Sequence, residues 1–251
     1  MTAQTSALIR RAGALTVGEL LSLQARRGPD RPALDDGRAQ LSYRELDQRA
    51  NRLAHALAAQ GVVRGSRVAI LAENRIEYIE ATFAAARLGA ILCALNWRLA
   101  RDELAHCVAL VEPTAVLLSP RFEAAWQALA TTDLSPIVLG PDYERRLAQA
   151  PSHEPPCVAE PEDGLLILYT SGTTGLPKGA LISHRAELAR MDLSRLDLDL
   201  TEGDGFVAWA PMFHMVSLEH AIHTLGMGGT VHVVDGADIA RLVELIETRQ
   251  Q

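Results

Sequence analysis

The sequence is poor in lysine and cysteine, and it has no long hydrophobic run. Of its 24 basic residues only Lys178 is a lysine. The three cysteines, Cys93, Cys107 and Cys157, show neither paired nor metal-ligand spacing, which favours a reducing compartment over a disulfide framework. The longest apolar stretch, near residues 88–95, is far below the ~20 residues that a membrane span needs, and no export signal is found. We therefore expect a cytoplasmic protein.

The charge balance and the composition exclude some classes of protein. The net charge is −7 and the isoelectric point is about 5.6, which argues against a nucleic-acid-binding surface. Hydrophobic residues make up 48% and charged residues 22%, as in ordinary globular proteins. A chain of 251 residues holds either one large domain or two small ones.

Apolar segments of strand length alternate with amphipathic segments of helix length along the chain. Asp-Gly at 36–37 predicts a β-hairpin, and the capping box at 42–45 begins a helix. This alternation predicts an α/β fold with parallel sheets flanked by helices. Prolines interrupt it over residues 140–163. We predict a first α/β subdomain with the hairpin over residues 1–150, an exposed linker over 151–163, and a further, incomplete α/β portion over 164–251.

The most informative segment follows an apolar run at residues 165–169. It combines four hydroxyl side chains, two glycines and the lone lysine. These residues are Thr170, Ser171, Gly172, Thr173, Thr174, Gly175 and Lys178. Hydroxyls donate to oxyanions, glycines let backbone N–H groups approach a ligand, and lysine supplies a compact positive charge. The pattern predicts a phosphate-binding loop.

Two other interpretations of this loop are weaker. The Walker loop places its lysine before Ser or Thr at the start of a helix, whereas here Pro177 precedes Lys178 and Gly179 follows it. A glycine-rich hairpin with a chance lysine does not explain why so many phosphate-binding groups occur within eleven residues.

Four stretches together resemble the adenylate-forming (AMP-binding) superfamily, of the acyl-CoA synthetase or fatty-acid-CoA ligase type. They are residues 41–54, residues 86–96, the phosphate loop, and Pro-Met-Phe-His at 211–214. The resemblance extends from about residue 17 to the final helix, and the loop is its most specific part. It covers only the N-terminal portion of such enzymes.

The resemblance implies a reaction and residues that take part in it. These enzymes activate a carboxylic acid with ATP as an acyl-adenylate and transfer the acyl group to coenzyme A. Residues 170–175 and Lys178 would hold the ATP phosphates, Lys178 and His214 would be catalytic, and Phe213 and His214 would contact the acid. No aspartate near His214 is available for an α-amino group, which favours a fatty or other organic acid. Ser217 replaces the usual glycine, so we expect a narrower acyl channel.

Several parts of such enzymes are absent from the sequence. The motif Tyr-Gly-x-Thr-Glu, whose glutamate holds Mg²⁺, does not occur, and a second lysine is missing. We therefore expect the Mg²⁺ ligand to lie outside this chain and the chain alone to be inactive. The partner would be a missing C-terminal portion, or another copy associating through exposed edges. A stand-alone module that binds a nucleotide or an acyl group without catalysis is the alternative, and a different phosphate-binding enzyme sharing only the loop is a third.

No metal site is predicted from the sequence. His220 and His223 lie one helical turn apart and have the spacing of metal ligands. No further ligands accompany them at suitable spacing, so we interpret both as packing or surface residues.

Overall fold

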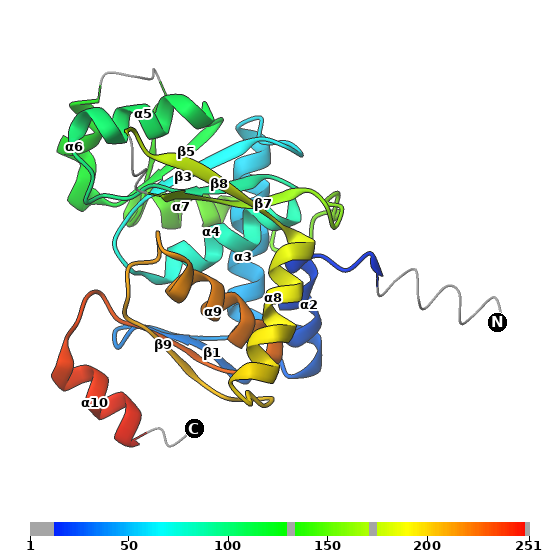
Figure 1. Cartoon of the computed structure of the whole chain (residues 1–251). Coiled ribbons are helices and arrows are strands. Elements are labelled where there is room, and N and C mark those ends of the chain that lie inside the picture. The colour runs from blue at the N-terminus through cyan, green and yellow to red at the C-terminus, as the bar shows by residue number, and fades with distance from the viewer. Residues whose placement is uncertain (1–12, 130–133, 171–174, 249–251) are drawn as a thin grey trace.

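The computed structural model describes residues 13–129, 134–170 and 175–248. Helices and strands alternate along these ranges (Figure 1). In chain order they are α2 (Val17–Arg27), β1 (Pro32–Asp35), β2 (Gln40–Ser42), α3 (Tyr43–Ala59), β3 (Arg67–Leu71), α4 (Ile76–Arg87), β4 (Ile91–Ala94), α5 (Arg101–Val111), β5 (Ala115–Leu118), the 3₁₀ helix η1 (Pro120–Phe122), α6 (Glu123–Gln127), β6 (Ile137–Val138), α7 (Pro141–Gln149), β7 (Gly164–Thr170), β8 (Lys178–Ser183), α8 (His184–Asp197), β9 (Phe206–Ala208), α9 (Met215–Met227), β10 (Val231–Val233) and α10 (Ile239–Thr248).

The strands form two sheets that are parallel except at one edge of each. The larger sheet has the order β6-β5-β3-β4-β7-β8, and the smaller has the order β2-β1-β10-β9. The antiparallel pairs are β7–β8 and β1–β2, and each is a hairpin. The predicted α/β fold with parallel sheets and flanking helices is confirmed, including the hairpin and the capping box, in which Ser42 Oγ accepts from the backbone N–H of Glu45.

Each sheet combines strands from both sides of residues 151–163. Strands β7 and β8 extend the sheet that β3 to β6 begin, and β10 pairs with β1. The predicted boundary between subdomains stays a prediction. The expectation that residues 140–150 interrupt the alternation was wrong, because α7 begins there with Pro141 in its first turn, where proline costs no hydrogen bond.

The core is layered, and successive residues of the central strands face opposite sides. Val68 and Ile70 belong to the cluster with α3 and α4, whereas Ala69 and Leu71 belong to the cluster with α5 and α6. Helices α2, α3, α4 and α9 fill the space between the two sheets (Figure 1). This arrangement positions the carboxyl ends of strands from both sheets near one another. In the described ranges no helix is both long and apolar enough to cross a lipid bilayer.

Candidate active site at the carboxyl ends of the strands

Asn74 joins the carboxyl ends of strands from the two sheets. It follows β3, and its Nδ2 lies 3.2, 2.8 and 3.0 Å from the carbonyl oxygens of Ala208, Ala210 and Val234, which lie at or beyond the ends of β9 and β10. Its Oδ1 accepts a hydrogen bond from the Met212 N–H at 2.8 Å. Ligands of open α/β sheets bind at this edge, so the strand ends around Asn74 frame a candidate site.

The predicted phosphate loop closes the β7–β8 hairpin. Thr170 ends β7 opposite Lys178, which begins β8, and the Thr170 hydroxyl lies 3.5 Å from the Lys178 carbonyl oxygen. Ser171, Gly172, Thr173 and Thr174 lie outside the described residues. Gly175 has a φ of 155°, which favours glycine. Because β7 runs parallel to β4, the turn end of the hairpin lies at the same edge as the groups around Asn74.

Lys178 lies on a strand rather than in the loop proper. Its side chain is exposed, as is that of Thr170. Within the described residues Lys178 forms no ion pair, whereas most of the chain's other charged contacts are arginine–carboxylate pairs. The ammonium is therefore available to an anion approaching the hairpin, and the Thr170 hydroxyl could donate to the same anion by leaving its long contact with the Lys178 carbonyl oxygen.

A cluster of aromatic and guanidinium groups surrounds Phe213. This side chain is buried, and its ring meets Trp97 edge-on with the centroids 5.8 Å apart. The Arg98 guanidinium lies 5.0 Å from the Trp97 ring centroid and 5.8 Å from that of Phe213. Arg121 lies 5.2 Å from the Trp97 centroid. Since Trp97 follows β4 and Arg121 follows β5, two more strand ends contribute to the site.

This cluster borders a cavity of about 180 Å³. Its lining combines positive, aromatic and polar groups from five strand ends. The lining residues are Asn74, Trp97, Arg98, Arg121, Trp209, Pro211, Asp235 and Gly236. A small organic anion fits the character of this lining, because guanidinium groups bind carboxylates and the indole rings offer flat apolar surface.

His214 occupies the N-cap position of α9 and is exposed. Its ring lies against Phe213 with the centroids 4.5 Å apart. Partial burial, and secondly the positive charge of Arg98, lower the pKa of His214 below its usual value. The imidazole is therefore neutral at pH 7 and able to donate one hydrogen bond and accept another. Ser217, one turn later, is fully buried.

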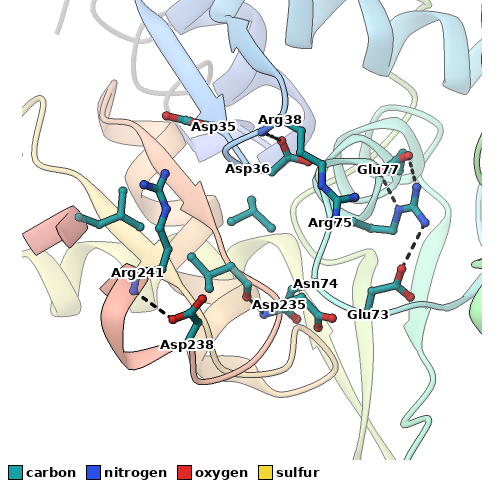
Figure 2. Close-up of a pocket in the computed structure, with 13 residues that line it drawn as sticks. Asp35, Asp36, Arg38, Glu73, Asn74, Arg75, Glu77, Asp235, Asp238 and Arg241 are labelled. Atoms are coloured by element: carbon teal, nitrogen blue, oxygen red, sulfur yellow. Dashed lines mark hydrogen bonds and ion pairs between the residues drawn. The ribbon is translucent and has the colours of Figure 1, made fainter. Parts of the chain in front are cut away.

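A larger cavity of about 470 Å³ lies beside the first and shares Asn74 and Asp235 with it (Figure 2). Six carboxylates line it, and only three guanidinium groups accompany them. The charged residues are Asp35, Asp36, Glu73, Glu77, Asp235, Asp238, Arg38, Arg75 and Arg241. Two of these carboxylates, Glu73 and Glu77, already pair with Arg75. An excess of negative charge repels a polyphosphate, so this cavity is a poorer nucleotide site than the hairpin that carries Lys178.

The structure groups the predicted site residues into two sets. Thr170, Gly175 and Lys178 lie at the turn end of the β7–β8 hairpin, and Phe213 and His214 lie by the aromatic cluster. No described contact joins the two sets. Sequence reasoning missed Asn74, Trp97, Arg98 and Arg121. Their common signal is a polar or aromatic residue within a few positions of the end of a buried strand.

Comparison with known proteins identifies the family. The model of the family described as AMP-binding enzyme matches residues 21–250. A feruloyl-CoA synthase of Amycolatopsis sp is 33% identical over 225 residues, which are 89% of this chain and 45% of that protein. An indoleacetate–CoA ligase of Aromatoleum aromaticum is 37% identical over 229 residues, which are 86% of this chain and 44% of that protein.

The fold comparison agrees with the sequence comparison. The crystal structure of ATP-bound MatB from Rhodopseudomonas palustris superposes with a TM-score of 0.81 at 28% identity, covering 93% of this chain and 48% of that one. The chain thus spans somewhat less than half the length of these relatives. Since the family match extends over most of the residues, including the hairpin and the strand ends around Asn74, the chain belongs to the AMP-binding enzyme family.

Proposed function

We propose that this chain forms the phosphate-binding and part of the acid-binding surface of an ATP-dependent acid–thiol ligase. In the proposed reaction a carboxylate oxygen attacks the α-phosphorus of ATP and pyrophosphate leaves. The thiol sulfur of coenzyme A then attacks the acyl carbon, and AMP leaves. The observation that carries the proposal is the position of Lys178 at the turn end of the hairpin, in a chain of this family. Its ammonium is exposed and forms no ion pair with any residue that the structure describes.

The proposed role of Lys178 is electrostatic. Its ammonium would neutralise negative charge on the β- and γ-phosphates as pyrophosphate departs. The Thr170 hydroxyl would donate to the same oxygens, with the loop residues Ser171 to Gly175 completing the cradle. Mg²⁺ would accompany ATP, and we expect its protein ligand to lie outside this chain.

The proposed substrate is an organic acid with a flat or apolar body. Arg98 provides positive charge beside Trp97, whereas Arg121 is paired with Asp235 at 3.2 Å. Phe213 and His214 border the same region. Neutral His214 would donate to a carboxylate oxygen. The relatives are named for feruloyl and indoleacetate groups, so an arylalkanoic acid is the first class to test, followed by a fatty acid.

We further propose that another polypeptide portion completes the site. Helix α10 exposes Ile239, Val243 and Ile246, at 66%, 45% and 68% of their surfaces, and α8 exposes Leu193 and Leu196 at 59% and 77%. Such apolar faces are typical of surfaces that another chain or domain covers. The remaining portion of a family protein is the proposed occupant, and self-association is the competing one.

Selective acylation of the lone lysine tests the nucleotide proposal. Because Lys178 is the only lysine, an amine-reactive ester can modify only Lys178 and the chain's α-amino group. We expect ATP to slow modification of Lys178 by at least about tenfold, as bound phosphate shields the ammonium, and to leave the α-amino rate unchanged. Peptide mapping by mass spectrometry measures both rates, with and without MgCl₂.

The control is AMP, which lacks the β- and γ-phosphates and should protect Lys178 much less than ATP. Equal rates at Lys178 with and without saturating ATP would show that this lysine does not contact the nucleotide. Pyrophosphate release should be undetectable for the chain alone and should appear when a C-terminal portion of a family protein is added. Turnover by the purified chain would contradict the proposed division of the site.

A further inference from the structure

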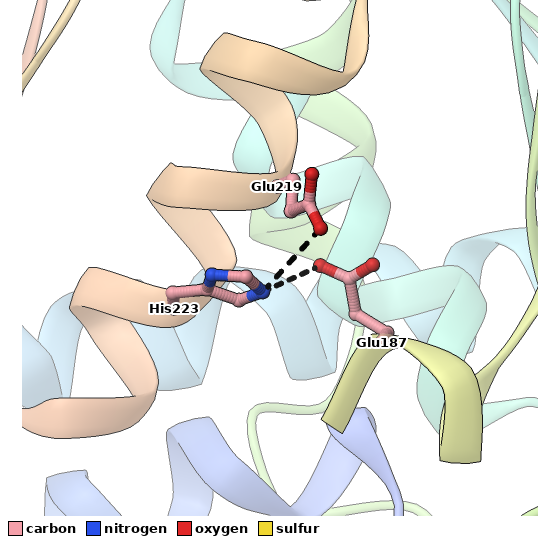
Figure 3. Close-up of side chains that lie close together, drawn as sticks. All are labelled: Glu187, Glu219 and His223. Atoms are coloured by element: carbon pink, nitrogen blue, oxygen red, sulfur yellow. Dashed lines mark ion pairs between the residues drawn. The ribbon is translucent and has the colours of Figure 1, made fainter. Parts of the chain in front are cut away.

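Three buried side chains with metal-binding atoms converge between α8 and α9 (Figure 3). Glu187 lies on α8, and Glu219 and His223 lie one turn apart on α9. His223 Nε2 is 3.2 Å from Glu187 Oε1 and 4.0 Å from Glu219 Oε1. One ligand atom from each residue lies within 4.8 Å of the others. The exposed fractions of the three side chains are 1%, 3% and 1%.

The hydrogen bonds around this cluster are incomplete. Neither carboxylate oxygen of Glu187 and neither ring nitrogen of His223 makes a hydrogen bond with any residue that the structure describes. Glu219 differs, because Arg190 donates to both of its oxygens. Burying a carboxylate without hydrogen bonds is costly. Among the described residues His223 alone lies at ion-pair distance from Glu187, and a bound cation would supply the missing interactions of both side chains.

We propose that Glu187, Glu219 and His223 bind a divalent first-row metal ion such as Zn²⁺. Imidazole together with carboxylate oxygens suits zinc and its neighbours, whereas Ca²⁺ and Mg²⁺ prefer oxygen ligands alone. Ligand atoms at about 2.0–2.2 Å from a tetrahedral zinc lie roughly 3.3–3.6 Å apart. The observed separations of 3.2 and 4.0 Å need only small side-chain rotations to reach that spacing.

The charges of the surrounding groups favour a cation. Arg190 pairs with Glu219, whereas among the described residues Glu187 forms no ion pair with an arginine and faces the imidazole of His223. Glu219 and His223 project from the same face of α9 because residues four apart lie one above the other on a helix. From the sequence His223 was interpreted as a packing or surface residue, because Glu187 is distant in sequence. Only the packing of α8 on α9 brings Glu187 next to His223.

The proposed ion would have a structural role at this site. Helix α8 follows the hairpin of Lys178, and α9 follows His214. A metal bound between the two helices would therefore fix the phosphate-binding segment relative to the acid-binding segment. This inference does not depend on the proposed ligase activity.

Zinc titration of the purified chain tests the proposal. After removal of metals with a chelator, calorimetry should show one tight zinc ion per chain, and the melting temperature should rise when zinc is added. Co²⁺ should give visible ligand-field absorption that zinc abolishes. Glu187→Gln and His223→Gln should each weaken zinc binding by at least about tenfold.

The matched control is His220→Gln. His220 lies on the same helix with its Nδ1 2.8 Å from the Val216 carbonyl oxygen, and it is not one of the proposed ligands. Zinc affinity should be unchanged in this variant. Absence of stoichiometric zinc binding by the wild type would overturn the proposal. Equal zinc affinity of the wild type and Glu187→Gln would overturn it too, because the zinc would then bind elsewhere on the protein surface.

The metal-free chain gives an independent measurement. If Glu187 is an uncompensated buried charge awaiting a metal, Glu187→Gln should raise the melting temperature of the chelator-treated chain. If Glu187 and a protonated His223 instead form a self-sufficient ion pair, the same variant should lower it, and that result would count against the metal site. Circular dichroism establishes that each variant is folded before titration.

Discussion

His184 is a buried histidine whose neutral form the fold requires. Its side chain is fully buried, and its Nδ1 accepts a hydrogen bond from the Val17 N–H at 3.2 Å. Burial lowers the pKa of His184 from 6.5 to about 4, and the nearby negative charge of Asp163 opposes this only in part. Protonation of Nδ1 would also break the bond to Val17, which anchors the start of α2 to the start of α8.

The lowered pKa predicts how stability depends on pH. Because the folded form has the lower pKa, the unfolded chain takes up a proton first as the pH falls. Above pH 6.5 this histidine has little effect, and between pH 6.5 and 4 it makes folding progressively less favourable. From pH 7 to pH 5 the expected loss from this single group is about 2 kcal/mol, from the linkage relation with those two pKa values.

The variant His184→Asn isolates this contribution. The asparagine Oδ1 can accept from the Val17 N–H in place of the histidine Nδ1, but asparagine does not titrate. Urea unfolding followed by circular dichroism at pH 7 and pH 5 measures the free energy of unfolding of both proteins. The wild type should lose about 2 kcal/mol more than the variant. Equal losses in the two proteins would refute the assignment of a neutral, buried His184.

Substitutions of Asn74, Arg87 and Gly229 test other buried contacts by urea unfolding at pH 7, with Arg101→Met at an exposed ion pair as the control. Asn74→Ala should cost about 3 kcal/mol because it leaves the Met212 N–H unpaired, and Asn74→Asp should cost more because the carboxylate oxygen in place of Nδ2 would face three carbonyl oxygens. Arg87→Met should cost about 3–5 kcal/mol, since it strips a partly buried carboxylate of its partner, whereas Arg101→Met at an exposed pair should cost less than about 1 kcal/mol. Gly229→Ala should cost about 3 kcal/mol or more, as its methyl would lie 1.9 Å from a backbone oxygen. An Arg87→Met variant that loses less than about 1 kcal/mol of unfolding free energy would contradict the contacts described above. A Gly229→Ala variant with an unchanged free energy of unfolding would do so as well.

The sequence predicted most elements because local signals and hydrophobic periodicity agreed. Asp-Gly at 36–37 lies between the antiparallel strands β1 and β2, and Ser42 caps α3 as its capping box indicates. Helix α7 was missed because the prolines over residues 140–163 were interpreted as breaking the helix–strand alternation. Proline in the first turn of a helix is in fact favourable, and Pro141 lies there. The order of the strands, and the sharing of each sheet between distant segments, depends on packing that no local pattern contains.

The candidate site was predictable in part for a similar reason. Lys178 and His214 lie in short motifs, so their chemistry can be read locally. Asn74 acts through carbonyl groups more than 130 residues away, and Glu187 meets His223 only because α8 packs on α9. A polar residue just past a buried strand marks the position of Asn74, yet its partners cannot be identified without the topology.

The preference for arginine in this chain follows from the contacts that its basic residues make. Arg87 is almost fully buried, and its planar fork donates to Asn51, Ser22 and Asp47 together, joining α4 to α2 and α3. A lysine ammonium could not span these acceptors, because its donors radiate from one point. Arg49 likewise bridges Glu80 and Glu144. In these contacts carboxylates of the protein itself neutralise the charge of each arginine. Lys178 makes no such pair within the described ranges, so a compact charge at the end of an exposed hairpin is left for a ligand to neutralise.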